Sequence, residues 1–451
     1  MYFNRIQKLS IVSFCLLLWA ACVHKEGGTR DMAINKYVLP AYERAKNMAV
    51  TNADSTILLC DYMLRLTKDI SDVDSFENII RLLKIQAITN KGNKNNALEL
   101  TKQYLNDYQD EASQAVFNFQ MGDLHYDLGQ YSEAVQYTQK GLILFRKLKD
   151  SSAIASCLNL LGLTLIEIGQ LKEAELAFFE AMSIYDAKKE LGLYGSVLQN
   201  IGNLYIDLEN NEKAKEYYLK ALAIKLKLND FVGIASISNN MGIIYRYTKP
   251  DSAIYYYTSM PKPNGDNDIL KHYIKGKFNL ANIYKDRGQL DSAFLIFKTV
   301  EQLCIENSIS QGIPRVLYSY GDIAYERGNV KDAIRYLDDA LAWCDSLKSI
   351  TLKKEMVKRK IEIYTETKQY KEALLAQQAY NVIADSIKIN ESKESMKLME
   401  QTNKDKLDLL NKLEAQKQSA ESAKHWKWFG IFIGTVFVSF VSIYLLSRRR
   451  Q

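Results

Sequence analysis

A small residue and an alanine recur about every 40 residues through most of this chain. Every step is 40 residues except for one step of 39 in each series. The first series is Gly122, Gly162, Gly202, Gly242, Ala281, Gly321 and, more weakly, Ile361; the second is Ala134, Ala174, Ala214, Ala253, Ala293, Ala333 and Ala373. A fixed period of this length marks a repeat solenoid, in which each unit packs mainly on its neighbours.

The scarcity of helix-breaking residues predicts that this array is all-α. The 451 residues include only 5 Pro and 21 Gly, and neither type occurs between Gly328 and Gly430. Both residue types disrupt the interior of a helix. Each repeat is therefore expected to be a helical hairpin, made of a first helix (helix A) and a second helix (helix B).

The spacing within one unit shows how the two helices pack. Gly202 and Tyr205 lie three residues apart and share one helix face, while Ala214, Tyr218 and Ala221 share a face of the next helix. Small residues let the two helices approach closely, and the large aromatic side chains fill the space beside them. Glycines are expected where helix A turns into helix B, at Gly129, Gly169, Gly288 and Gly328.

These residues resemble the tetratricopeptide repeat, whose pattern is a small residue, an aromatic, a turn glycine, and then alanine, aromatic and alanine. The resemblance covers residues 113–387, and residues 31–112 are expected to add degenerate repeats, for roughly eight or nine helical pairs. The period exceeds the usual value of about 34 and resembles a subclass with longer helices. Prolines between Tyr247 and Asp268 predict either a longer surface loop or a hinge.

The resemblance implies that the A helices line a groove that binds a peptide or a protein segment. On each A helix, the positions three before, one after and four after the small residue share a stripe, and asparagines recur two residues before the small residue. An amide both donates and accepts hydrogen bonds, so it suits an extended peptide backbone; the alternative is that these amides only bridge helices. The candidate groove residues are Tyr126, Asn200, Asn203, Asn240, Arg246, Asn279, Asn282 and Tyr325.

The beginning of the chain indicates export. Residues 1–22 combine Arg5 and Lys8 with a short apolar run, a pattern typical of a signal peptide. The residues before Cys22 resemble a bacterial lipobox, although Trp19 stands where that motif has an aliphatic residue. Two interpretations stay open: lipidation of Cys22, or an ordinary cleaved signal or uncleaved anchor in which this cysteine has no role.

The end of the chain indicates a membrane anchor. The segment 428–447 is predicted to span the membrane, because the 18 residues from Phe429 to Leu446 carry no charge, which is long enough for a transmembrane helix. The tail at 448–451 carries three arginines, and positive residues favour the cytoplasmic side. The repeats are therefore predicted to be periplasmic, held by a single span in the inner membrane of a bacterial cell envelope.

Residues 388–427 are polar, charged and free of Gly and Pro, which predicts a helical stalk between the repeats and the span. Apolar residues fit the a and d positions of a heptad pattern, with two interruptions: the fitting residues are Met396, Met399, Leu410 and Leu413, and the interrupting ones are Asn403 and Lys406. A coiled-coil homodimer, a single solvated helix and a disordered tether remain as alternatives.

Nothing in the sequence predicts catalysis, a metal site or a cofactor. No known catalytic or phosphate-binding signature occurs. The cysteines outside the export signal, Cys60, Cys157, Cys304 and Cys344, form no CxxC pair and are expected to be buried apolar residues. His125 replaces the aromatic of its repeat, so we expect it to be packed rather than catalytic.

The charge distribution argues against nucleic acid as a partner. The net charge is +6, and Arg5, Lys8 and the three terminal arginines account for five of these charges. The rest of the chain holds 54 basic and 53 acidic residues, whereas nucleic-acid-binding domains show a basic patch or stripe.

Two functional hypotheses follow. The first is a membrane-anchored periplasmic scaffold that binds a peptide or a protein in its groove. The second is a receptor subunit that acts through the stalk and the span on a separate output partner. The order of segments resembles the sensor half of bacterial tetratricopeptide signalling proteins, whose span leads to a kinase or a helix-turn-helix domain. This sequence has no such domain after the predicted span, so neither activity is expected of it.

Overall fold

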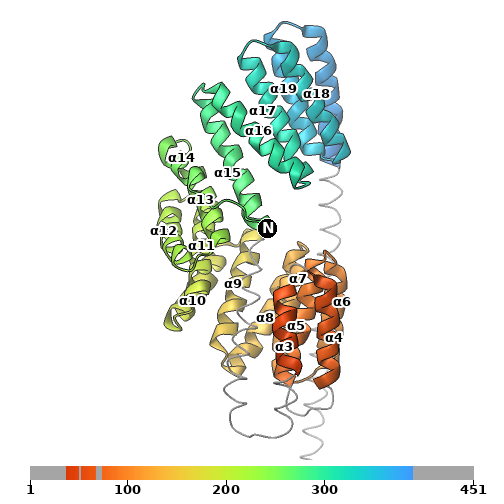
Figure 1. The fold of residues 1–451 in the computed structure, drawn as a ribbon, viewed down its shortest axis with the longest axis vertical. Coiled ribbons are helices and arrows are strands. Elements are labelled where there is room, and N and C mark those ends of the chain that lie inside the picture. The colour runs from red at the N-terminus through yellow and green to blue at the C-terminus, as the bar shows by residue number, and fades with distance from the viewer. Residues whose placement is uncertain (1–36, 50–51, 68–73, 390–451) are drawn as a thin grey trace, which may run out of the picture. The chain divides into compact units, whose positions relative to one another are not determined.

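A computed structural model describes residues 37–49, 52–67 and 74–389 of the chain (Figure 1). The predicted export signal with Cys22, the stalk beyond residue 389, the span at 428–447 and the basic tail lie outside these residues. Within the described ranges, no helix is both long and apolar enough to cross a membrane.

The described residues are helical and contain no strand, as predicted. They form nine helical pairs. The helices are α3 (Leu39–Met48), α4 (Ala53–Thr67), α5 (Asp74–Asn90), α6 (Lys94–Asp107), α7 (Glu111–Asp127), α8 (Tyr131–Leu148), α9 (Ser151–Glu167), α10 (Leu171–Ala187), α11 (Leu191–Asp207), α12 (Asn211–Lys227), α13 (Phe231–Tyr245), α14 (Pro250–Thr258), α15 (Asn267–Asp286), α16 (Leu290–Glu306), the short 3₁₀ helix η2 (Ser310–Gly312), α17 (Ile313–Glu326), α18 (Val330–Ser346), α19 (Ile350–Glu366) and a last helix over 370–389.

The chain divides into two compact units, Met1–Ile296 and Phe297–Gln451, and the division falls within α16. In the first unit, the A helices of the repeats are α5, α7, α9, α11, α13 and α15. Each B helix packs against its own A helix and against the A helix that follows, and most successive A helices also touch each other. The A helices therefore form one layer, and the B helices α6, α8, α10, α12 and α14 form the other.

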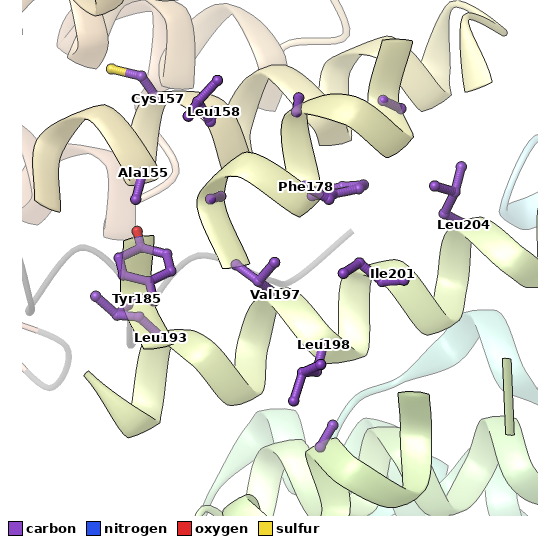
Figure 2. Close-up of a cluster of buried hydrophobic side chains, with 14 of the residues drawn as sticks. Ala155, Cys157, Leu158, Phe178, Tyr185, Leu193, Val197, Leu198, Ile201 and Leu204 are labelled. Carbon is purple, nitrogen blue, oxygen red and sulfur yellow. The ribbon is translucent and has the colours of Figure 1, made fainter. Parts of the chain in front are cut away.

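In several repeats, direct contact with the B helix requires the small residue to be glycine. A Cβ atom added to Gly202 would lie 2.6 Å from the Tyr218 ring, far inside normal van der Waals contact. Gly162 lies against Phe178 in the same way, at 2.7 Å. Figure 2 shows Phe178 among the buried side chains that α9, α10 and α11 contribute to one core. The recurring glycine and aromatic thus form one packing unit across the hairpin.

Two kinds of turn connect the helices. Gly169, between helices A and B of its repeat, has φ of 79°, a left-handed conformation that glycine adopts without strain. The other predicted turn glycines behave alike. Lys189 follows helix B and is also left-handed, with φ of 56°, although it is not glycine. The glycines therefore predicted most turns from helix A to helix B, but not those at Glu209 and Lys368, and they missed the second kind of turn.

The proline-rich interruption at 247–268 holds a short helix and a loop. Helix α14 has only 9 residues, and the loop that follows keeps Met260 buried, with its sulfur beside Gly276 of α15. The division between the two compact units lies elsewhere, at Ile296. These observations agree with the interpretation of this segment as a surface loop.

Candidate binding face on the A helices

Of the predicted stripe, the positions one and four residues after the small residue lie mostly at the surface of the first unit. The positions three before it were predicted wrongly, because Asn159, Gln199 and Asn239 are buried. We call the surface part of the stripe the A-helix face. It is only partly buried, and its middle is apolar: Ile243 of α13 is 50% exposed, and the α9 and α11 residues are of intermediate exposure. Its members at the surface are Tyr126, Leu163, Ile166, Asn203, Ile206, Ile243, Arg246, Asn282 and Lys285, whereas Asp123, at an equivalent position, is buried.

Asn200 and its neighbour Asn159 lie beneath this face rather than on it. The Nδ2 of Asn200 donates to Oδ1 of Asn159, one repeat earlier, at 2.8 Å. Both side chains are buried, Asn200 completely. A ligand on the A-helix face would therefore not reach Asn200 in this conformation, and its amide links α9 to α11.

Asn203 and Asn240 form a three-membered hydrogen-bond network with Tyr218. The Tyr218 hydroxyl donates to Oδ1 of Asn203 at 2.7 Å, and Nδ2 of Asn240 donates to the same oxygen at 3.1 Å. One repeat later, Nδ2 of Asn279 donates to Oδ1 of Asn239 at 3.3 Å. These amides bridge neighbouring A helices, which was the alternative that the sequence left open.

Arg246 also connects two A helices. Its guanidinium lies 2.8 Å from Oδ2 of Asp286, at the end of α15. Asn282 donates to the Phe278 carbonyl of its own helix at 3.1 Å. The basic side chain expected to meet a ligand is thus neutralised by the next repeat.

Tyr126, on helix α7, has acidic side chains around it. Its ring lies 5.9 Å from that of Tyr131. Burial raises the pKa of Tyr126, and the nearby carboxylate of Glu167 raises it further. Burial also raises the pKa of Tyr131. The charge of Glu167 and a hydrogen bond between the two side chains raise it further.

Tyr325, the last predicted groove residue, belongs to the second unit. Its hydroxyl donates to the Glu366 carboxylate of α19, and the Arg359 guanidinium lies 5.3 Å from the centre of its ring. Arg359 also pairs with Asp322 at 2.7 Å and with Glu362 at 3.0 Å. In the second unit, a charged network thus joins α17 to α19.

A row of acidic residues, which the sequence analysis missed, ends the A helices. Six of them terminate on an acid, at Asp127, Glu167, Asp207, Asp286, Glu326 and Glu366. The signal was available, because these residues also recur at steps of about 40. An acid at the C-terminus of a helix opposes the helix dipole, which disfavours negative charge there. An acid at the end of each of these helices is therefore expected to have a basic partner that compensates its charge.

Glu167 and Asp207 have no basic partner among the described residues, whereas Asp286 has Arg246 and Asp127 has Lys94, at 3.9 Å. The reason lies one repeat earlier. Asp286 pairs with Arg246 of the repeat before it. In the repeat before Asp207, the equivalent residue is Ile166, which carries no charge. Burial raises the pKa of Asp207, and the charge of Glu167 raises it further. Two neighbouring repeats thus place uncompensated acids beside the apolar middle of the A-helix face.

The other residues singled out in the sequence are structural. Cys60, Cys157, Cys304 and Cys344 are free and buried, as predicted, and burial raises the pKa of the Cys60 thiol to about 12. His125 is buried and stacks on Tyr137, with ring centres 5.2 Å apart. Within the described ranges, no group of His, Cys, Asp and Glu side chains could hold a metal ion.

Comparison with protein families identifies the repeats. Two tetratricopeptide repeat profiles match the chain, one over residues 113–187 and one over residues 195–227. The chain contains tetratricopeptide repeats. Both matches fall on the hairpins that build the middle of the A-helix face, and the stretch between 113 and 187 spans the two hairpins α7–α8 and α9–α10.

Solved structures of tetratricopeptide-type solenoids are similar to this chain. The apo form of the quorum sensor NprR from B. thuringiensis has a TM-score of 0.56 at 13% identity, covering 78% of this chain and 99% of that one. A Rap protein in complex with competence and sporulation factor has a TM-score of 0.49 at 14% identity, covering 77% and 98%. At these identities the likeness concerns the fold alone. No curated protein matches the chain in sequence.

Proposed function

We propose that the A-helix face binds an extended peptide or a segment of a partner protein. One observation carries this proposal: partly exposed apolar side chains lie on successive A helices, beside two acids that have no basic partner in the described chain. An extended segment laid along this row would remove apolar surface from water, at roughly 25 cal/mol per Å². The bridging asparagines hold the A helices at a fixed spacing beneath it.

The charges specify the chemistry of the ligand. Glu167 and Asp207 would be neutralised by a lysine or an arginine of the bound segment, and charge-assisted hydrogen bonds to carboxylates are among the stronger ones. The flanking residues Ile166 and Ile206 favour apolar neighbours for that basic residue. The ligand proposed here is therefore an apolar segment with at least one basic residue. A binding role without catalysis is part of the proposal.

The proposed setting is the bacterial cell envelope, with the repeats in the periplasm. It rests on the export pattern in residues 1–22 and on the uncharged run in 428–447, both read from the sequence. In this setting the protein would act as an inner-membrane scaffold with protein partners and no nucleic acid.

Site-specific photo-crosslinking in membranes tests the binding face. A photoreactive residue at Ile206 should capture a discrete partner. The same residue at Leu176, which is 72% exposed on helix α10, is the matched control and should capture none. Equal capture from both positions, or capture from neither, would overturn the proposal.

A second experiment tests the role of the acids. The double variant Glu167→Gln/Asp207→Asn should weaken capture at position 206 at least about tenfold, because it removes both charges without changing side-chain size. Glu173→Gln, at an exposed position on α10, serves as the control and should leave capture unchanged. Full capture by the double variant would exclude a basic ligand residue at this place.

A receptor role is the second candidate, and one observation favours it. The sequence from Asn329 to Phe429 contains neither Gly nor Pro, so nothing in it interrupts a helix between the repeats and the predicted span. Disulfide crosslinking between cysteines placed in the stalk should then differ with and without the partner captured at position 206. Identical crosslinking in both states would leave the scaffold as the better proposal.

A further inference from the structure

Two hydrogen-bond donors of the α13–α14 hairpin (Figure 1) are buried and have no acceptor among the described residues. They are the Nε–H of Arg246 and the hydroxyl of Tyr257. Tyr257 is only 1% exposed. Burial raises the pKa of its hydroxyl to about 12, and the nearby charge of Arg246 opposes this rise. Buried donors in folded proteins are nearly always paired, so two unpaired donors near each other need an explanation.

The preceding repeat shows which partner the tyrosine has lost. There the Tyr218 hydroxyl donates to Oδ1 of Asn203 at 2.7 Å. In the α13–α14 hairpin, Ile243 stands at the position equivalent to Asn203 and has no side-chain acceptor. The Tyr257 hydroxyl therefore keeps the buried place of Tyr218 without the acceptor that belongs to it.

Packing within the hairpin does not account for this hydroxyl. In the α9–α10 hairpin, the equivalent position also holds an apolar residue, Leu163, and the aromatic there is Phe178, which has no hydroxyl. A phenylalanine ring would also fill the space of Tyr257 against Gly242, where an added Cβ would lie 2.4 Å from the ring. A buried donor without an acceptor costs stability. Its presence here favours an acceptor that a ligand supplies.

The two donors lie beside surface that a ligand could cover. Ile243 and Tyr247, four residues apart at the end of α13, are 50% and 82% exposed. The Arg246 side chain is 23% exposed, and its guanidinium is held by Asp286. Since Tyr257 is almost fully buried, an incoming acceptor would shift Arg246 and leave the tyrosine in place.

We propose that a backbone carbonyl of the segment bound to the A-helix face accepts hydrogen bonds from Arg246 Nε and from the Tyr257 hydroxyl. The proposal rests on the proposed binding of an extended segment, and it adds the point at which the main chain of that segment is held. A carbonyl suits these donors better than a carboxylate, because Asp286 already balances the charge of Arg246 at 2.8 Å. One carbonyl oxygen has two lone pairs and can accept from both donors.

The place of these donors sets the register of the bound segment. Arg246 belongs to α13, and Asp207 ends the preceding A helix α11, to which α13 is joined by the hydrogen bond from Asn240 to Asn203. Neighbouring packed helices lie about 10 Å apart, and an extended chain advances roughly 3.3 Å per residue. The carbonyl bound at Arg246 is therefore expected about three residues from the basic residue that Asp207 binds.

Two conservative variants test the contact in the capture experiment at position 206, with the full-length chain in membranes. Tyr257→Phe removes only the hydroxyl. Arg246→Lys removes the Nε donor and keeps a positive charge for Asp286. Each should weaken capture about fivefold, the effect of one lost hydrogen bond. Tyr255→Phe, on the same helix α14 but 65% exposed, is the matched control and should leave capture unchanged.

Thermal melts of the full-length chain in detergent, without partner, test whether the hydroxyl is already satisfied inside the fold. Tyr257→Phe should leave the melting temperature unchanged or raise it, because the lost hydroxyl donates to nothing in the described chain. Tyr218→Phe should lower it, because that hydroxyl donates to Asn203. A lower melting temperature for Tyr257→Phe would mean that a partner within the free protein, such as a buried water, satisfies the hydroxyl, and the proposal would be wrong.

The capture results distinguish this contact from the proposed function. If the wild type is captured and either Tyr257→Phe or Arg246→Lys is captured equally well, the carbonyl contact is refuted and the binding face stands. Equal weakening by Tyr255→Phe would also refute the contact, because the effect would not depend on the buried donor. If the wild type captures nothing at position 206, both proposals fail.

Discussion

Asp207 costs its own repeat stability, and removing its charge should therefore stabilise the fold. The side chain ends helix α11, where the helix dipole disfavours a negative charge, and Glu167 adds repulsion. The two effects together are worth about 0.3–1 kcal/mol for a surface group screened by water. Asp207→Asn keeps the shape of the side chain. We expect slower hydrogen exchange in α11 of the full-length chain, by roughly two- to fivefold at neutral pH.

The effect should depend on pH with a definite sign. The pKa of Asp207 is raised in the fold, so its ionisation disfavours the folded state, and the penalty grows as pH rises above the ordinary value of 3.8. Below that value the wild type and Asp207→Asn should exchange alike. Asp286→Asn is the control: it also ends an A helix but loses its ion pair with Arg246, so it should bring no gain. Equal gains from both variants, or a loss from Asp207→Asn, would refute the reasoning.

Three further predictions concern the fold. Lys225 is buried, and its ammonium lies 2.7 Å from the Asp230 carboxylate. Lys225→Met should lower the free energy of unfolding, measured by urea titration, by about 3–5 kcal/mol. Adding Asp230→Asn to this variant should restore much of the lost stability. Burial lowers the pKa of His272 to about 4, so stability should fall as pH drops from 6.5 to 4, and His272→Gln should flatten this part of a melting-temperature profile. Gly202→Ala should destabilise by about 1–3 kcal/mol in thermal melts, because its Cβ would strike a tyrosine ring, whereas Gly192→Ala, with only one atom at 3.8 Å, should not.

The repeat period predicted the architecture because it reports packing directly. The glycine and the aromatic residue, such as Gly202 and Tyr218, occur together in several repeats because neither can change size without the other. One period therefore contains the packing contacts of one hairpin. The same logic failed at turns after helix B. Left-handed residues such as Lys189 and Asn229 are not glycine, so they left no mark in the sequence.

The candidate site was predicted less well, for a different reason. The asparagines suggested a ligand because an amide can both donate and accept hydrogen bonds. Their actual partners, Asn159 for Asn200 and Asn203 for Asn240, lie about 40 residues away in the sequence and are seen only in the fold. The acids that end the A helices do recur in the sequence, but the lack of a basic partner for Asp207 depends on a different repeat, which has Ile166 where a later repeat has Arg246. Pairing across repeats decides which polar residues are free, and a single period does not contain that information.

The amide bridges are expected to make the layer of A helices stiffer than the layer of B helices. Side-chain hydrogen bonds such as those from Asn200 and Asn240 fix the separation of neighbouring A helices, whereas a more exposed ion pair, between Arg146 and Glu180, links the B helices α8 and α10. Bending should therefore stretch the B layer and leave the A layer at constant length. A strand lying on the A layer would keep its register while the array flexes around it, so mechanical strain and ligand affinity would be largely uncoupled.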